Sequence, residues 1–129
     1  MAILVGEMSQ RAPTTVEELL IRYAAGERSF VGTELDMPGV DLTGARLDGA
    51  DFSRSWFSTS FRGASLRATC FHDANVKCCD FSGADLTNAD FTGAALDATV
   101  FSGAVLTGAR FKGADLQGSE LLEGEQPDW

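Results

Sequence analysis

The sequence predicts an all-β solenoid, and three features of the chain indicate this fold class. Large apolar residues recur every five positions from Leu42 to Leu121, with a single step of four between Phe57 and Phe61. From Phe61 onward, a small residue (Ala, Thr, Cys or Ser) stands two positions before each large one. Nine of the chain's 14 glycines stand two positions after a large residue of this series. A fixed period of this kind is typical of proteins built from stacked repeats.

A five-residue period fits neither an α-helix, which repeats every 3.6 residues, nor a strand, which repeats every two. Each unit instead needs two inward positions, one large and one small, and three outward ones. A short extended stretch followed by a bend meets this need. Glycine suits the bend because it reaches backbone conformations closed to other residues.

Three units show the repeat most clearly: residues 84–88, 89–93 and 114–118 read Ala-Asp-Leu-Thr-Asn, Ala-Asp-Phe-Thr-Gly and Ala-Asp-Leu-Gln-Gly. They closely resemble the repeats of the pentapeptide-repeat protein family, and the resemblance covers about residues 30–122. It implies a right-handed, quadrilateral parallel β-helix with four pentapeptides in each coil. We therefore expect a β-helix of about five coils over residues 28–122.

Steps of twenty residues along the sequence agree with four sides. Two opposite sides collect phenylalanines and the two sides between them collect aliphatic residues, so like side chains would stack from coil to coil. The residues predicted to form the core are Phe52, Phe61, Phe71, Phe81, Phe91, Phe101, Phe111, Leu66, Leu86 and Leu106.

The repeat changes length at two places. We interpret the step of four between Phe57 and Phe61 as one residue deleted at a corner, which would place Phe52 above Phe71. A step of seven before Leu42 predicts a two-residue bulge.

A capping α-helix is expected over residues 15–26, because the ends of a solenoid expose unpaired strand backbone and need cover. Residues 15–18 match a capping box, and Gly26 matches a helix stop. One face of this helix is apolar and collects Val16, Leu19, Leu20 and Tyr23. The segment 17–30 resembles the leader common in bacterial, notably cyanobacterial, members of the family.

An N-terminal tail is expected over residues 1–14 and an acidic C-terminal tail over 123–129. The apolar run at residues 1–5 is too short for a signal peptide or a membrane span. We expect a cytoplasmic protein without membrane contact.

No spacing in the sequence predicts a metal, cofactor or catalytic site. Cys70, Cys78 and Cys79 lack the spacing of a zinc motif, and His72 is the only histidine. Cys79 should point inward, whereas Cys70 and Cys78 should point outward, as free thiols in a reducing compartment. An interior filled by Phe, Leu and Ala implies no pocket, so we do not expect an enzyme.

Charge is unevenly distributed along this chain of net charge −9: residues 52–79 sum to +3, whereas 1–51 sum to −5 and 80–129 to −7. Four basic residues occupy the same outward position on four successive sides, and we call them the basic girdle: Arg62, Arg67, His72 and Lys77. The favoured interpretation is pairing with aspartates of the next coil, about 4.8 Å away. The functional alternative is a belt that binds an anion or a partner.

Four apolar residues stand at positions that should face solvent: Trp56, Ala95, Val100 and Val105. Exposed apolar groups in combination indicate a contact surface, and Trp56 is the residue most typical of an interface. Alternatively, Trp56 folds over the corner left by the deletion.

The function predicted is a non-catalytic, rigid interaction module with an unidentified protein partner. Direct binding of nucleic acid is not expected of so acidic a chain, and we expect a monomer or weak dimer. The alternative comes from the resemblance: a DNA mimic that binds DNA gyrase or another topoisomerase, as in the quinolone-resistance branch of the family. The acidity favours this alternative, and the basic girdle opposes it. The fold alone does not choose between them.

Overall fold

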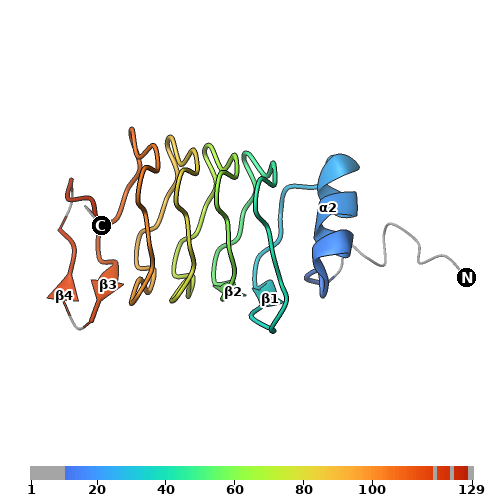
Figure 1. Ribbon diagram of the computed structural model, residues 1–129, viewed down its shortest axis with the longest axis horizontal. Coiled ribbons are helices and arrows are strands. Elements are labelled where there is room, and N and C mark those ends of the chain that lie inside the picture. Colours follow the sequence, from blue (N-terminus) through green and yellow to red (C-terminus); the bar gives the residue numbers. More distant parts are fainter. Residues whose placement is uncertain (1–10, 118, 123, 128–129) are drawn as a thin grey trace, which may run out of the picture.

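The computed structural model describes residues 11–117, 119–122 and 124–127 of the 129-residue chain. The chain winds into a rod of stacked coils with a helix at its N-terminal end (Figure 1). The elements are helix α2 and four short strands, namely α2 (Val16–Ala24), β1 (Glu34–Leu35), β2 (Trp56–Phe57), β3 (Asp115–Leu116) and β4 (Ser119–Glu120).

Successive coils are joined by parallel backbone pairing. Strand β1 pairs with β2, with Glu34 opposite Trp56. Isolated parallel bridges continue this ladder, and one coil pairs with the next through Ser60–Asp80, Ser65–Asp85, Cys70–Asp90 and Asn75–Ala95. The bridges lie five residues apart along the chain and twenty residues apart between these coils, so each coil has four sides. Each strand is short because the chain turns a corner after every unit.

The irregular steps in the repeat are absorbed without loss of register. Asp51 pairs with Cys70 at an offset of nineteen residues, and the ring of Phe52 stacks on Phe71 at a centroid distance of 5.5 Å. The predicted register across the shortened step is therefore correct. One coil earlier, the bulge before Leu42 raises the offset to twenty-two, and Phe30 lies over Phe52.

The regular units close with a four-residue turn that begins at the large residue. The N–H of Ala64 donates to the carbonyl of Phe61 at 3.0 Å, and Gly63 between them has a φ of +64°. A positive φ at the third residue is the geometry of a type II turn and explains the recurring glycine. Among the described residues, seven non-glycine residues also have a positive φ: Arg54, Ala68, Asp73, Cys78, Asn88 and Ala98 at the equivalent turn position, and Gln117 in the last unit.

The interior is filled by two columns of phenylalanine rings. Within a column the rings stack face to face, with 4.9 Å between Phe61 and Phe81 and 4.9 Å between Phe71 and Phe91. Between the columns they meet edge to face, as Phe71 and Phe81 do at 5.8 Å. Nine of the ten predicted core residues are buried, whereas Leu106, on the last coil, is only half-buried.

The parallel ladder ends at Asp115, which pairs back with Ala95. From there the chain reverses, since β3 and β4 pair antiparallel and the N–H of Gly113 donates to the carbonyl of Leu121 at 2.8 Å. The prediction that regular units continue to residue 122 is therefore wrong for the last unit. A unit at the end of a solenoid has no following coil to pair with, so its backbone groups are satisfied by folding back.

The C-terminal tail lies against the last coil. The Nε2 group of Gln126 donates to the carbonyls of Leu106 and Ala109, at 2.8 and 3.1 Å, and Pro127 is buried.

Helix α2 begins and ends at recognisable caps. The Thr15 hydroxyl accepts from the N–H of Glu18 at 3.0 Å, but the Glu18 carboxylate reaches the N–H of Thr14 rather than that of Thr15. The predicted capping box is thus only half formed. At the other end, the N–H of Gly26 donates to Tyr23 and the N–H of Glu27 donates to Arg22, the hydrogen-bond pattern of a Schellman motif.

The buried face of α2 differs from the predicted one. Leu19 is fully buried and Tyr23 donates its hydroxyl hydrogen to the carbonyl of Asp48 at 2.7 Å. Leu20, expected on this face, is exposed, and Arg22 is buried instead.

Phe91 lies in the middle of its column, stacked on Phe71 and Phe111 at 4.9 and 5.0 Å. Phe91→Ala should lower the free energy of unfolding by about 3–5 kcal/mol, since it leaves a cavity that rigid neighbours fill poorly. Urea titration of both proteins measures the difference. A loss below about 1 kcal/mol would contradict the stacked core.

Two glycines offer a matched test of the contact between coils. A Cβ on Gly83 would meet no heavy atom closer than 4.0 Å, whereas a Cβ on Gly93 would lie 2.2 Å from Oδ1 of Asp73. Gly83→Ala should cost about 1–2 kcal/mol for the left-handed backbone alone. Gly93→Ala should cost more, and the excess should vanish in an Asp73→Gly background, as a double-mutant cycle of unfolding free energies would show. Equal costs for the two single variants would contradict this contact.

Candidate interaction surface

The basic girdle is paired with the coil that follows it. Arg62 contacts Asp80 at 3.0 Å and Arg67 contacts Asp85 at 3.1 Å. Lys77 lies 4.0 Å from Asp97 of the following coil, whereas the imidazole of His72 contacts Asp73 of its own unit at 3.3 Å. These exposed pairs each contribute little to stability, but they leave the middle of the rod covered by matched charges. The geometry thus favours pairing between coils over a free anion-binding belt.

The aspartate that precedes the large residue of a unit also caps the turn of that unit. Oδ1 of Asp85 accepts from the N–H of Thr87 at 3.1 Å and from its hydroxyl at 2.6 Å. Asn75 accepts in the same way from the N–H of Lys77 at 3.1 Å. This local hydrogen bond explains why Asp or Asn recurs at the position.

Hydrogen bonds hold the pKa of two of these carboxyl groups below the ordinary value. Those from Ser82 are the largest cause at Asp80, and those from Thr87 are the largest cause at Asp85. The guanidinium groups of Arg62 and Arg67 lower the two pKa values further. Both carboxylates are therefore stabilised in the ionised form.

The four apolar residues predicted to form a contact surface do not lie together. Trp56 and Ala95 share one side, because both pair with Asn75 in the ladder. Val100 and Val105 are exposed but lie on the next two sides, opposite Asp80 and Asp85 respectively. The sequence prediction of one surface is accordingly limited to the Trp56 side.

Trp56 is half exposed, at 50% of its surface, and stands directly opposite Glu34 of the neighbouring strand. Half of this large ring system thus faces solvent, and the corner at residues 58–60 does not enclose it. A tryptophan exposed on a rigid strand is typical of a protein contact.

A cleft that the sequence did not predict lies between the start of α2 and the bulge. Its volume is about 350 Å³, and it is lined in part by Val16, Glu17, Leu35, Met37, Pro38 and Val40. A second lobe shares Met37 and includes Glu34, the residue paired with Trp56. We call both lobes together the N-terminal cleft. Met37 is 46% exposed there, and the step of seven in the repeat was the one sequence signal for it.

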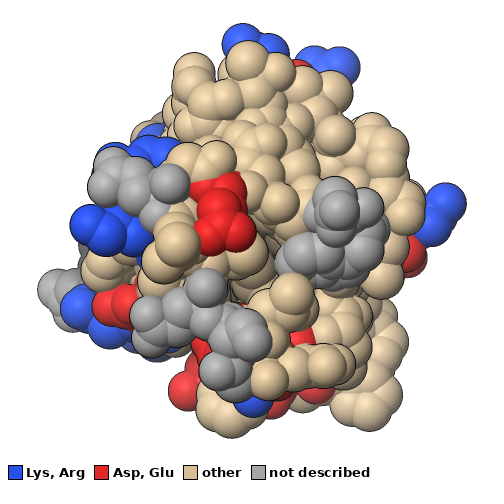
Figure 2. Space-filling view, turned by 90° about the vertical axis from the view of Figure 1, so that its left-hand side faces the viewer, with Lys and Arg blue, Asp and Glu red and all other residues tan. Residues whose placement is uncertain are grey.

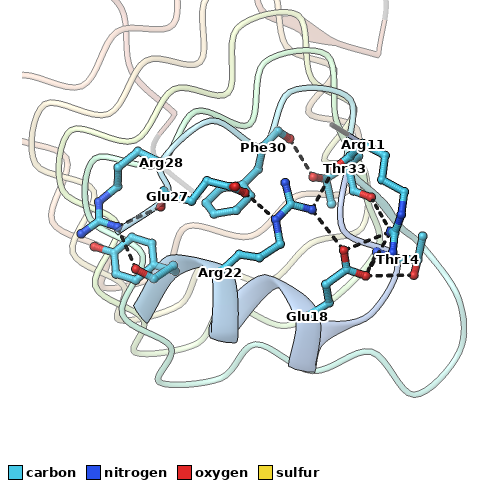
Figure 3. A network of polar contacts seen from close by, with 10 residues as sticks. Arg11, Thr14, Glu18, Arg22, Glu27, Arg28, Phe30 and Thr33 are labelled. Carbon is cyan, nitrogen blue, oxygen red and sulfur yellow. Dashed lines mark hydrogen bonds and ion pairs between the residues drawn. The ribbon is translucent and has the colours of Figure 1, made fainter. Parts of the chain in front are cut away.

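A buried arginine ties the helix to the first coil (Figure 3). Arg22 is only 3% exposed, and its guanidinium donates to Glu18 at 3.1 Å, to the carbonyl of Arg11 at 2.8 Å and to Glu27. It also lies 5.5 Å from the ring centre of Phe30, the first ring of the core. Because its charge is matched by two carboxylates, the cluster serves packing of the helix and leaves Arg22 closed to a ligand.

Burial acts to raise the pKa of the Glu18 carboxyl, but the hydrogen bonds from Thr14, Arg11 and Arg22 outweigh it and lower the pKa. Glu18 is thereby held as the ionised partner of Arg22.

The three cysteines are free and differ in environment. Cys79 is buried, donates to the carbonyl of Phe57, and has its pKa raised by burial to about 12. Cys78 is exposed, whereas Cys70, expected to point outward, is half-buried with its sulfur 3.2 Å from the Ser53 hydroxyl. Among the described residues, no group of three or more His, Cys, Asp or Glu side chains is arranged to hold a metal ion.

Figure 2 shows the C-terminal end of the rod, where the lysine and arginine side chains lie mostly at the margin and an acidic group lies nearer the centre.

The lowered pKa values of Asp80 and Asp85 predict a pH dependence of stability. An unfolded aspartate titrates near pH 3.9, so the stabilisation is present above that pH and is lost as the pH falls through the lower folded pKa. Asp80→Asn/Asp85→Asn keeps the turn caps and removes the titrating groups, so it should lose less stability than the unchanged protein between about pH 5 and pH 3. Chemical denaturation at each pH measures this, and parallel curves for the two proteins would contradict it.

The repeats of this chain match those of known proteins. The family model for pentapeptide repeats matches residues 33–60 and 84–121 in eight copies, just over half of the chain. No curated protein sequence matches the chain. No helix in the described part of the chain has the length and apolar character that crossing a membrane requires.

Several solved structures are similar to this one. A pentapeptide repeat protein from Nostoc PCC 7120 is 33% identical over 91% of this chain and 93% of its own, with a TM-score of 0.46. One from the thylakoid lumen of Arabidopsis thaliana is 34% identical over 64% of this chain and 69% of its own, with a TM-score of 0.41. Full-length QnrB1, a plasmid-mediated fluoroquinolone resistance protein, is 19% identical over 69% and 72%, with a TM-score of 0.24. The eight matched repeats, which span more than half of the residues, show that the chain belongs to the pentapeptide-repeat family.

Proposed function

We propose that the protein is a non-catalytic interaction module that presents one side of a rigid rod to a protein partner. The observation that carries the proposal is Trp56, half exposed on a strand and adjacent, through Glu34, to a cleft containing the half-exposed Met37. Covering the ring of Trp56 costs little ordering entropy, because the strand already fixes its backbone.

The core supports this function through its rigidity. Two interlocked columns of rings and a continuous backbone ladder hold each coil against its neighbours. A surface on such a scaffold keeps its shape in the free protein, which favours recognition without refolding.

The alternative function, mimicry of DNA towards gyrase or another topoisomerase, is favoured by the net charge of −9. Mimicry of a duplex requires negative charge repeated along the rod. Arg62, Arg67 and Lys77 interrupt any such row, since each stands beside an aspartate of the next coil. We therefore place the protein-interaction module first.

We also propose that the protein works in the cytoplasm, as a monomer or weak dimer without direct contact to nucleic acid or membrane. Three free cysteines, one of them exposed, are typical of a reducing compartment.

Site-specific photocrosslinking in the source organism tests the module. A photoreactive phenylalanine analogue at position 56 or 37 should capture a discrete set of proteins, and the same analogue at the exposed Thr107, on another side, should not. With the captured partner purified, Trp56→Ala should weaken binding at least about tenfold, as loss of an interface anchor does. Equal capture from position 107, or unchanged affinity of Trp56→Ala, would contradict the proposal.

A further inference from the structure

The rim of the N-terminal cleft is acidic, and its charges are unmatched. Glu17 and Glu34 line the two lobes, and Asp36 stands between the lining residues Leu35 and Met37. Within residues 11–117, 119–122 and 124–127, none of these three carboxylates forms an ion pair. The chain also has no lysine or arginine between Arg28 and Arg46 to supply one.

This arrangement differs from that of the aspartates further along the rod. Asp80, Asp85 and Asp97 each have a cation of the preceding coil within 4.0 Å. Within the described residues, the carboxylates around the cleft thus have no cationic partner, and a cation supplied by a partner protein could take that place.

We propose that the N-terminal cleft binds an extended segment of a partner protein in which a large apolar residue stands beside a lysine or arginine. This inference rests on the interaction function proposed above and names the chemistry of the partner. Charge complementarity selects the occupant: Glu17 and Glu34 line the cleft and Asp36 follows the lining residue Leu35 in sequence, while Val16 and Val40 offer apolar surface.

The cleft has room for a side chain or two of such a segment. The volume of its first lobe, about 350 Å³, lies at the low end of binding pockets for small ligands. Met37 suits the apolar contact because its unbranched thioether adapts to the shape of the group that it meets.

The neighbouring Trp56 would complete the recognition of the cation. Its half-exposed ring stands opposite Glu34, so an ammonium or guanidinium group can contact the ring face and the carboxylate together. The rim charges would also speed association with a basic segment and make binding sensitive to salt.

Selection from a phage library of random dodecapeptides on the full-length protein, followed by fluorescence anisotropy of the enriched peptide, tests this. The enriched sequences should carry Lys or Arg next to a large apolar residue. Glu17→Gln/Glu34→Gln/Asp36→Asn should weaken the peptide at least tenfold, and Met37→Ser should weaken it severalfold. The control Asp73→Asn/Asp90→Asn/Asp115→Asn removes the same charge from other coils and should change affinity less than twofold.

Several results would overturn the inference. They are enrichment of peptides without basic residues, equal effects of the two triple variants, and displacement of the probe by a synthetic peptide of the chain's own first seven residues. Self-association of the protein that is lost in Met37→Ser would assign the cleft to a second copy instead. Crosslinks from position 56 that persist in the cleft variant would reject the cleft and leave the interaction module standing.

Discussion

The structure depends on the agreement between two spacings. Backbone rungs of a parallel ladder lie about 4.8 Å apart, and the rings of Phe61, Phe71, Phe81 and Phe91 stack at 4.9 Å within each column. A ring in one coil therefore meets a ring in the next without tilting the backbone, and the two columns lock together edge to face. Since the columns tolerate no shift, changes in unit length are confined to corners, at the shortened step after Phe57 and at the bulge before Leu42.

That fixed register also decides which surface residues meet. Arg62 and Asp80, like Arg67 and Asp85, are eighteen residues apart, because one follows and the other precedes a large residue on the same side. An aspartate in such a column has two partners, the N–H groups of its own turn and the cation of the preceding coil. Where valine replaces it, at positions 100 and 105, the side chain can form neither interaction. The surface chemistry of each side therefore depends on which residue each coil places at the outward positions.

Repetition also explains which parts the sequence could predict. The position of Phe52 over Phe71 and the pairing of the basic girdle follow from counting, since every repeating position has a known neighbour. The buried Arg22, the reversal at β3 and β4, and the N-terminal cleft lie where the repeat ends or is interrupted. There the partners of a residue are contributed by segments outside the period, and spacing carries no information about them.

The uniform offset between the C-terminal coils has a consequence for how such a chain can lengthen in evolution. Every parallel bridge with both of its residues between Ser60 and Asp115 joins positions twenty apart. A tandem duplication of the sixty nucleotides that encode residues 61–80 would insert one complete coil. Each phenylalanine ring would again stack on a phenylalanine, and each backbone bridge would again form. A duplication that also includes the shortened step after Phe57 would instead copy the irregular corner. Duplications in the coding sequence can therefore lengthen the C-terminal half of the rod by whole coils.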